Sequence, residues 1–349
     1  MATSPYRRQP PPFAVRCLLG VVMDGIMTPL GWTLEKLGRA NRMFQGFHQR
    51  NLRRLKKANP FGSYTPGPQD VFVATFAKSG TNWMMQIVTQ LAWHGKAEFE
   101  HIHELVPWPD SEAFGPIKRF AIPIGLDYVW KASPEHKRAV KTHLNWEFIP
   151  FSEQARYIMV IRDPKDVFVS GYHFFKESVM GRGLSTETWL QLFQSDHFPI
   201  GGSWALNAAS YWAERRRPNV MVLSFKSMKQ DLEGTVRKVA EFLDIHLREE
   251  ELSEVCSKSS FASMKRAEKK FEMWDLIPWR KHTPMIRKGV QGGSSEVLSL
   301  RQQREMDAYF MAELKRLGSD LPYAEFADIT PGVESGEGVA AGPALRNSR

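Results

Sequence analysis

Residues 70–83 have the sequence Asp-Val-Phe-Val-Ala-Thr-Phe-Ala-Lys-Ser-Gly-Thr-Asn-Trp. The first part is largely apolar and partly β-branched, which predicts a short buried strand. From Trp83 to Leu91 the apolar residues have helical spacing. A loop between such a strand and helix aims backbone N–H groups, and the positive end of the helix, at an anion. The segment therefore predicts a phosphate-binding loop.

The position of the lysine separates this loop from the ATP-binding P-loop. The ATP-binding loop places its lysine after the second glycine, as G-x-x-x-x-G-K-[ST]. Here Lys78 precedes the only glycine, Gly80, and an indole follows at Trp83. This order favours phosphate binding by a protein other than an ordinary NTPase.

The rest of the chain predicts an α/β domain. Strands are expected at 71–76, 139–142, 157–161 and 220–225, and helices at 82–93, 165–176, 228–243 and 300–317. Alternating strands and helices favour a central parallel sheet flanked by helices. Binding loops in such sheets lie at the carboxyl ends of the strands. Because Lys78, His143 and Arg162 each follow a predicted strand, they are expected to converge on one edge.

Three further segments support a resemblance to a known family. Lys141-Thr142-His143 is a K-T-H segment, residues 162–174 fit R-[ND]-x-K-D-V-x-V-S-x-Y-H-F, and residues 287–292 fit R-K-G-x-x-G. With the K-S-G-T-x-W loop, these segments span Ala77 to Gly292 in family order. The chain resembles the sulfotransferases that use 3′-phosphoadenosine 5′-phosphosulfate (PAPS), and among them the cytosolic type and bacterial-like members.

The resemblance implies a single P-loop-type domain, the co-substrate PAPS, and transfer of a sulfuryl group to a hydroxyl or amine of a small-molecule or lipid acceptor. It implies His143 as general base, Lys78 at the leaving group and Lys141 at the sulfuryl oxygens. An imidazole suits a base because it titrates near neutrality. The implied donor-binding residues are Lys78, Ser79, Gly80, Thr81 and Asn82 at the 5′-phosphate, Trp83, Phe225 and Ser259 near adenine, and Arg162, Ser170, Arg287, Lys288 and Gly289 at the 3′-phosphate.

The chain departs from the family pattern at several positions. Ala77 stands where proline is usual, Phe225 where tyrosine is frequent, and Ser259 where threonine is usual. The late loop continues as Gly292-Gly293-Ser294 instead of G-D-W. The family's dimerisation motif is not recognisable, so the sequence leaves the oligomeric state open.

Composition fits one large globular domain in a reducing, cytoplasmic compartment. The chain has 349 residues, of which 42% are hydrophobic and 24% charged, and its two cysteines form no disulfide framework. His94, His101, His103 and Glu104 suggest a metal site, but no further ligand pair is evident and the chemistry needs no metal. Residues 101–108 are expected in the wall of the acceptor pocket or in a surface loop. Met180, Phe114, Phe120 and Trp130 are expected in the core rather than in an apolar pocket.

The basic character of the chain resides in its N-terminal region. Residues 1–60 contain eleven Lys and Arg and two acids, Asp24 and Glu35. Their difference, a charge of +9, equals the net charge of the whole chain. The catalytic domain is therefore neutral overall, and no nucleic-acid partner is predicted. Residues 13–32 are apolar after a basic start, like a signal peptide. Arg16 and Asp24 interrupt them and Pro29 is expected to break them, so no clean spanning helix is predicted.

Residues 32–57 predict a basic amphipathic helix. Three interpretations remain open for the N-terminal region: a structural helix packed on the domain, peripheral attachment of residues 13–57 to the cytoplasmic face of a membrane, or a cleaved or unstructured leader. The expected organisation is a basic helical extension with a linker at 1–63, the sulfotransferase domain at 64–327, and a flexible tail at 328–349.

Two other functions compete with sulfuryl transfer. A P-loop small-molecule kinase would need a G-K-[ST] ending and a magnesium-binding acid after a strand; Asp163 is the nearest candidate for that acid. A membrane-attached nucleotide-binding protein without catalysis would be expected to lack Lys78 or His143, and the sequence has both. The identity of the acceptor is not determined by the sequence.

Overall fold

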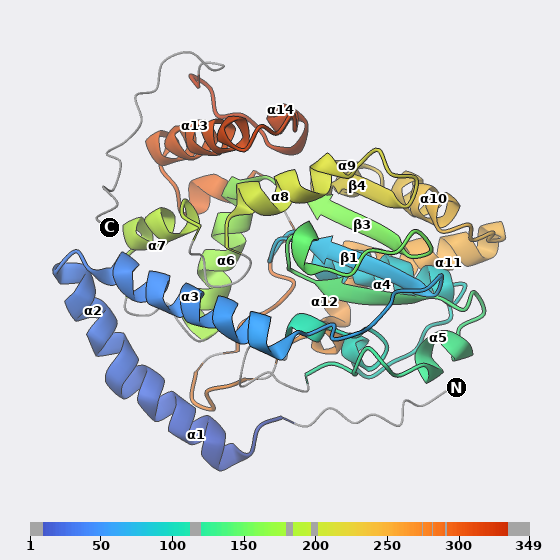
Figure 1. The fold of residues 1–349 in the computed structure, drawn as a ribbon, viewed down its shortest axis with the longest axis horizontal. Helices are drawn as coiled ribbons and strands as arrows, with labels where there is room; N and C mark the ends of the chain where they lie inside the picture. The colour runs from blue at the N-terminus through green and yellow to red at the C-terminus, as the bar shows by residue number, and fades with distance from the viewer. Residues whose placement is uncertain are drawn as a thin grey trace.

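The computed structural model describes residues 10–111, 120–178, 184–196, 202–273, 275–280, 282–289 and 292–333. Its centre is a four-stranded parallel sheet with the strand order β2-β1-β3-β4 (Figure 1). The strands are β1 (Asp70–Thr75), β2 (Arg138–Thr142), β3 (Arg156–Ile161) and β4 (Val220–Ser224). The predicted parallel α/β architecture is confirmed.

Both faces of the sheet are covered, as expected for parallel strands. Successive residues of a strand point to opposite faces, so Phe72 and Ala74 enter one hydrophobic core while Val71 and Val73 enter the other. The Phe72 core also receives side chains from α6, α7, α8 and α13, and the Val71 core from α4, α10 and α11. The two cores fix the sheet between layers of helices (Figure 1).

Fourteen α-helices surround the sheet in the described part of the chain. They are α1 (Phe13–Val22), α2 (Thr28–Lys36), α3 (Ala40–Ala58), α4 (Thr81–Ala92), α5 (Tyr128–Ala132), α6 (Pro164–Ser178), α7 (Thr186–Phe193), α8 (Trp204–Ala213), α9 (Phe225–Gln230), α10 (Leu232–Phe242), α11 (Glu249–Ser259), α12 (Phe261–Arg266), α13 (Leu300–Arg316) and α14 (Tyr323–Phe326). A π-helical segment, η1 (Met23–Met27), joins α1 to α2, and the short 3₁₀ segments are η2 (Ile102–Glu104), η4 (Trp146–Phe148), η5 (Glu268–Phe271) and η6 (Gly293–Glu296).

Helices α4, α6 and α13 lie where helices were predicted. The expected helix at 228–243 is also present, but the structure divides it into two helices. Phe225 does not end strand β4; it begins α9, and a second helix, α10, starts at Leu232. Asp231 separates the two helices with φ −141°. Its carboxylate accepts the backbone N–H of Gly234 at 2.8 Å. An aspartate that caps a helix from a non-helical backbone ends the preceding helix.

The N-terminal region differs most from expectation. Helices α1, η1 and α2 follow one another without a break. Pro29 lies in the first turn of α2, directly after the π-helical segment Met23–Met27, and the helix continues through it. By length and composition, Phe13–Lys36 is long and apolar enough to cross a membrane, although only 6% of its most apolar stretch is buried. A signal sequence or a buried core helix meets the same criteria. The expectation that Pro29 breaks the segment is therefore wrong.

Helix α3 is a structural part of the domain. Ala40 and Phe44 enter the Phe72 core, and Met43 and Phe47 pack against it. The cations of α3 lie on its exposed side. The structure thus supports domain packing for the apolar face of residues 40–58.

The first residues of the predicted flexible tail, 328–349, are held by the domain. The backbone N–H groups of Asp328 and Thr330 donate to Asp163 and Asp307 at 3.0 and 2.8 Å, and Arg304 donates to the carbonyl oxygen of Pro331 at 2.6 Å. Residues 328–331 are therefore bonded to the domain. The predicted tail beyond residue 333 lies outside the described residues.

Candidate active site

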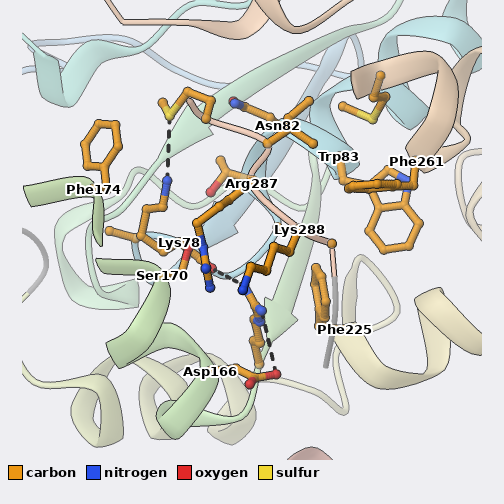
Figure 2. A pocket seen from close by; sticks show the side chains of 18 of the residues that line it. Lys78, Asn82, Trp83, Asp166, Ser170, Phe174, Phe225, Phe261, Arg287 and Lys288 are labelled. Atoms are coloured by element: carbon orange, nitrogen blue, oxygen red, sulfur yellow. Dashed lines mark hydrogen bonds and ion pairs between the residues drawn. The ribbon is translucent and has the colours of Figure 1, made fainter. Parts of the chain in front are cut away.

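A cavity of about 450 Å³ opens at the carboxyl edge of the sheet. Lys78 follows β1, His143 follows β2, Arg162 follows β3 and Phe225 follows β4, and all four line it. The expected convergence of Lys78, His143 and Arg162 is thus observed. Figure 2 shows Lys78, Ser170, Arg287 and Lys288 gathered together, with Trp83, Phe225 and Phe261 beside them.

The loop between β1 and α4 has the backbone of an anion cradle. Lys78 and Gly80 adopt the left-handed region, with φ of 71° and 97°. A Cβ on Gly80 would lie 2.8 Å from the ring of Phe225, so this position requires glycine. The hydroxyl of Ser79 is buried and has no hydrogen-bond partner among the described residues. Alternating left-handed residues at a helix N-terminus, with an unpaired buried donor, fit an anion.

Lys78 is a partly desolvated cation inside the cavity. Its Nζ lies 3.6 Å from the Sδ of Met285 and 4.2 Å from the ring centre of Phe174 (Figure 2). Burial, and then the charges of Arg162 and Arg287, lower the pKa of Lys78 to about 7. An ammonium group in apolar surroundings gains strongly from an incoming anion.

His143 is held in one tautomer. Its Nδ1 lies 2.8 Å from the backbone carbonyl oxygen of Thr75, which can only accept, so Nδ1 carries the proton and Nε2 is the free base. Burial, and then the charge of Lys141, lower the pKa of His143 to about 3, so the imidazole is neutral at pH 7. The same ring lies edge-on to Trp108 at 5.7 Å.

Asp110 is a buried residue that sequence analysis missed. Its Oδ2 accepts the backbone N–H of His143 at 2.6 Å, and its carboxylate accepts the hydroxyl of Thr142 at 3.1 Å. Burial raises the pKa of Asp110 to about 6. Because 33 positions separate Asp110 from His143, no local spacing could have revealed the contact.

Lys141 lies beside His143 on the same strand end. Its Nζ is 3.5 Å above the ring of Trp108. Burial lowers the pKa of Lys141 to about 7; the carboxylate of Asp110 opposes this effect and the charge of Lys78 adds to it. Lys78 and Lys141 therefore form a pair of buried amines that repel each other until an anion neutralises them.

Arg162 is oriented by contacts on both sides. Its Nη1 donates to the backbone oxygen of Lys78 at 3.1 Å, its Nη2 lies 3.6 Å from Asp166, and its guanidinium stacks over Phe225 at 4.4 Å. Asp166, which sequence analysis did not single out, also accepts the N–H of Gly292 at 3.2 Å. This carboxylate thereby links the start of α6 to the late loop.

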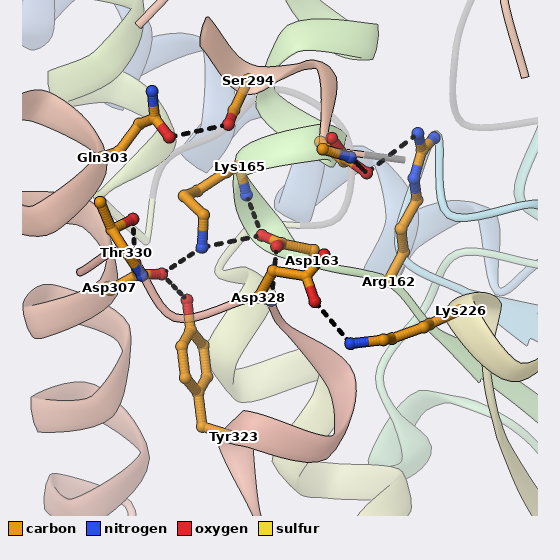
Figure 3. A network of polar contacts seen from close by, with 12 residues as sticks. Arg162, Asp163, Lys165, Lys226, Ser294, Gln303, Asp307, Tyr323, Asp328 and Thr330 are labelled. Atoms are coloured by element: carbon orange, nitrogen blue, oxygen red, sulfur yellow. Dashed lines mark hydrogen bonds and ion pairs between the residues drawn. The ribbon is translucent and has the colours of Figure 1, made fainter. Parts of the chain in front are cut away.

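A second polar network surrounds Lys165, just after the carboxyl end of strand β3 (Figure 3). Lys165 forms ion pairs with Asp163 and Asp307. Asp307 also accepts the hydroxyl of Tyr323 at 2.7 Å. Asp163 accepts the N–H of Lys165 at 2.8 Å and is absent from the residues lining the cavity. Asp163 is therefore engaged as a structural residue.

The late loop pairs its cations with a carboxylate. Arg287 donates to both oxygens of Glu296 at 2.8 and 2.9 Å, and Lys288 reaches the same group at 3.1 Å. Hydrogen bonds from Arg287 and then Lys288 lower the pKa of Glu296 to about 2. A Cβ on Gly289 would collide with the ring of Phe261, and its φ is +59°. Glycine therefore lets this loop lie against Phe261.

Aromatic rings line the side of the cavity next to the loop. Trp83 lies 5.5 Å from Phe225 in an edge-on arrangement, and Phe261 lies near both in Figure 2. The indole N–H of Trp83 donates to the carbonyl oxygen of Ser259 at 2.8 Å. Ser259 is fully buried and does not line the cavity. It positions the indole, and its neighbour Ser260 reaches the cavity wall.

The remaining predicted residues are divided between the cavity and the interior. Gly80, Thr81, Asn82, Ser170, Arg287, Lys288 and Gly289 line the cavity, while Ser79 lies behind it. Apolar lining residues that the sequence did not identify are Phe174, Phe175, Met264, Met273, Met285 and Ile286. Trp108 lines the cavity as expected. Phe120 packs in a small core cluster with it, Trp130 is not among the lining residues, and Met180 and Phe114 lie outside the described residues.

The histidines near residue 100 have protein partners. His94 pairs with Glu135 at 2.5 Å, His101 contacts the carbonyl oxygen of Glu272 at 2.9 Å, and His103 contacts that of Val106 at 2.8 Å. In the described ranges, no group of three or more His, Cys, Asp or Glu side chains could hold a metal ion. Cys17 and Cys256 are free thiols.

Comparisons with known proteins identify the family of the chain. Residues 68–318 match the model of the sulfotransferase domain family. The chain is 29% identical to sulfotransferase 2A1 of Macaca fascicularis, over 79% of this chain and 93% of the relative. It is 30% identical to sulfotransferase 1A1 of Mus musculus, over 71% and 85%.

Among solved structures, a retinol dehydratase in complex with retinol and PAP is similar, with a TM-score of 0.62 and 24% identity over 78% of this chain and 88% of that one. The chain belongs to the sulfotransferase family and is an enzyme of that class. The family match begins at residue 68, so helices α1 to α3 lie outside it.

Proposed function

We propose that the protein transfers the sulfuryl group of PAPS to a hydroxyl group of an apolar small molecule. One observation carries the donor assignment. The described lining of the cavity contains six cations and one acid: Lys78, Lys141, Arg162, Lys229, Arg287 and Lys288 against Asp166. A donor with a 5′-phosphosulfate and a 3′-phosphate supplies the negative charge that such a site requires.

The proposed roles of the residues are those that the family resemblance implies, and the lining of the cavity supports them. The loop from Ser79 to Asn82 binds the 5′-phosphate through backbone N–H groups at the start of α4. Trp83 and Phe225 contact the base. Arg162, Ser170 and the late loop at 287–289 bind the 3′-phosphate.

Sulfuryl transfer resembles phosphoryl transfer, in which positioning and charge stabilisation dominate. The acceptor oxygen forms a bond to sulfur while the bond from sulfur to the phosphate oxygen breaks. The acceptor proton passes to Nε2 of His143, and Lys78 stabilises the charge that develops on the leaving phosphate. Negative charge of a bound donor next to Lys78 and Lys141 raises the pKa of His143 above its value in the empty site, which strengthens the base.

The acceptor assignment rests on the apolar part of the wall. Trp108, Phe174 and Met285 lie around Lys141, His143 and Lys78. Apolar side chains near a single base fit a molecule with a hydrophobic body and one hydroxyl group. Retinol, in the related solved structure, is an alcohol of this kind.

Calorimetry with 3′-phosphoadenosine 5′-phosphate (PAP) and AMP tests the donor. Each charged hydrogen bond to the 3′-phosphate is worth about 1.5–3 kcal/mol, so PAP should bind at least about tenfold more tightly than AMP. Arg162→Ala should remove most of this preference. Lys226→Ala is the matched control, because Lys226 pairs with Asp328 and does not line the cavity. Equal affinities for PAP and AMP would contradict the donor assignment.

Turnover tests the reaction class. The protein is incubated with radiolabelled PAPS and a panel of phenols, aliphatic alcohols, amines and sterols, and in parallel with radiolabelled ATP. Label should pass from PAPS to an apolar alcohol or phenol. Transfer from ATP would instead support the kinase alternative, and PAP binding without transfer to any acceptor would support a non-catalytic binding protein.

A further inference from the structure

The continuous helix α1–η1–α2 turns apolar side chains outward and polar side chains toward the protein. Its outward side carries Phe13, Leu18, Val21 and Ile26, whose side chains are 58–68% exposed. A surface helix of a soluble domain normally presents the opposite pattern, with apolar residues toward the core. The outward face of this helix is therefore suited to an apolar environment rather than to water.

The polar side chains of the same helix face the protein. Arg16 donates to the carbonyl oxygen of Asp275 at 2.7 Å. Asp24 accepts the indole N–H of Trp279 at 2.7 Å and pairs with Arg280 at 2.5 Å. Because these contacts fix the rotation of the helix about its axis, the apolar side cannot turn inward while they hold.

Close packing adds to this restraint. A Cβ on Gly20 would lie 2.3 Å from the ring of Trp279 and 2.9 Å from Ile277. Glycine lets the helix backbone approach segment 275–280 this closely. The same segment lies between Met273 and Met285, which both line the cavity. The helix is thus attached to the part of the chain that forms one wall of the active site.

The other end of the helix is bonded to a different part of the domain. Glu35 accepts the backbone N–H of Ser185 at 2.9 Å and the hydroxyl of Thr188 at 2.5 Å, at the start of α7. A helix of 24 residues is about 36 Å long. If it crossed a bilayer, one end would lie far from the domain, so contacts at both ends place it along the enzyme surface (Figure 1).

Exposed cations lie next to this apolar face in the chain. Lys36, Arg39 and Arg42 follow directly, and Arg50, Arg53, Arg54, Lys56 and Lys57 lie on the exposed side of α3. The two acids of the region, Asp24 and Glu35, are the ones already engaged by the domain. Apolar side chains with unneutralised cations nearby are complementary to an anionic lipid surface.

We propose that residues 13–57 dock the enzyme on the surface of an anionic lipid bilayer, with α1–η1–α2 lying in the plane of the membrane and the cations of α3 attracted to the headgroups. This inference does not depend on the donor or the acceptor. Docking brings the cavity wall that contains Met273 and Met285 close to the lipid, where an apolar acceptor would be dissolved.

Vesicle flotation of the full-length protein tests the proposal. The vesicles consist of phosphatidylcholine alone or with phosphatidylglycerol, at low and moderate salt. The protein should float with the anionic vesicles only, and less at moderate salt, because exposed charges are screened over about 10 Å at 0.1 M. Release by high salt without detergent would agree with an in-plane helix.

Two pairs of variants identify the surface. The double variant Leu18→Gln, Ile26→Gln should lower partitioning onto the anionic vesicles at least about tenfold. Each apolar side chain that is buried in the lipid contributes about 1.5–3 kcal/mol to binding. Leu300→Gln is the control, because Leu300 is 61% exposed on α13. Arg53→Glu with Arg54→Glu should lower partitioning about tenfold or more, at about 1 kcal/mol per cation near the surface. Arg301→Glu with Lys315→Glu, both exposed on α13, should change it little.

Four outcomes would overturn the proposal. The first is no flotation under any condition, and the second is an equal loss of partitioning in the α13 controls. The third is that only detergent, and not high salt, releases the protein from the vesicles, which would indicate a spanning helix. The fourth is a dimer in light scattering that the Leu18 and Ile26 substitutions dissociate, without flotation. That result would show that a second copy of the chain covers the apolar face.

Discussion

The Nδ1 of His143 lies 2.8 Å from the carbonyl oxygen of Thr75, so the end of strand β1 fixes the tautomer of a side chain at the end of strand β2. The two strands are adjacent and parallel, with Ala74 opposite Thr142. The hydrogen bond therefore results from the register of the sheet. It leaves Nε2 unprotonated, which is the condition for a general base.

Replacing His143 should separate catalysis from binding. In His143→Ala, kcat should fall by about 10²–10⁴-fold, because the proton acceptor is lost, while the Kd for PAP stays within a few-fold of the original value. His94→Ala is a matched control, since His94 pairs with Glu135 and does not line the cavity. Near-normal turnover in His143→Ala would show that another residue is the base.

Asp110 should act as a positioning residue with its own pH signature. Its pKa is raised to about 6 by burial, so the carboxylate becomes protonated below pH 6 and loses strength as an acceptor for the N–H of His143. The rate should therefore fall as pH decreases through about 6. In Asp110→Asn, kcat should be lower and this acidic limb should disappear, while KM for the donor changes little. An unchanged pH profile of kcat in Asp110→Asn would contradict this role.

Donor binding should weaken as pH rises above neutrality. Burial lowers the pKa of Lys78 and of Lys141 to about 7, so both amines are charged below pH 7 and lose protons above it. Binding of PAP requires the charged forms, and its Kd should rise between pH 7 and pH 9 by up to about tenfold per unit for each lysine. The phosphates of PAP are already ionised there.

Calorimetry in buffers of different ionisation enthalpy should detect the proton uptake that accompanies PAP binding. Lys78→Arg provides the comparison, because an arginine keeps its charge and should remove part of the pH dependence. A Kd that is constant from pH 7 to pH 9 would show that the two amines stay charged in the empty site.

Glu296 should compete with the donor for the late loop. Its carboxylate accepts from Arg287 and Lys288, which are the cations proposed for the 3′-phosphate. Glu296→Gln should tighten PAP binding by up to about fivefold, since a partly exposed ion pair is worth at most about 1 kcal/mol. Glu305→Gln is a control on α13, where Glu305 pairs with Arg301 at 2.7 Å. Weaker PAP binding in Glu296→Gln would show that the carboxylate positions the loop instead.

Helix α3 should contribute to global stability, and α1 should not. Phe44 is 1% exposed and lies in the Phe72 core, whereas Phe13 is 68% exposed. Phe44→Ala should lower the free energy of unfolding by about 3–5 kcal/mol, and Phe13→Ala by less than about 0.5 kcal/mol. Urea denaturation of both variants measures the difference. Equal effects would mean that α3 is not packed as the structure shows.

The sequence by itself determined the parallel sheet, the phosphate loop and the segments that supply Lys78, His143 and Arg162. These features are local: a strand followed by a loop and a helix is written in consecutive residues, and parallel strands bring their carboxyl ends to one edge. The sequence also determined the family, through four motifs in order, which the match over residues 68–318 confirms.

Only the tertiary structure decided the contacts between distant residues. Asp110 reaches His143 across 33 positions, and Glu296 at the end of η6 reaches Arg287 and Lys288 across nine and eight positions. The direction in which α1 turns its apolar face was likewise fixed by Asp275, Trp279 and Arg280, some 250 residues away. Periodicity tells which residues share a face of a helix. Which part of the chain packs against that face depends on the free energy of apolar burial and of polar pairing, and both depend on contacts between residues far apart in the sequence.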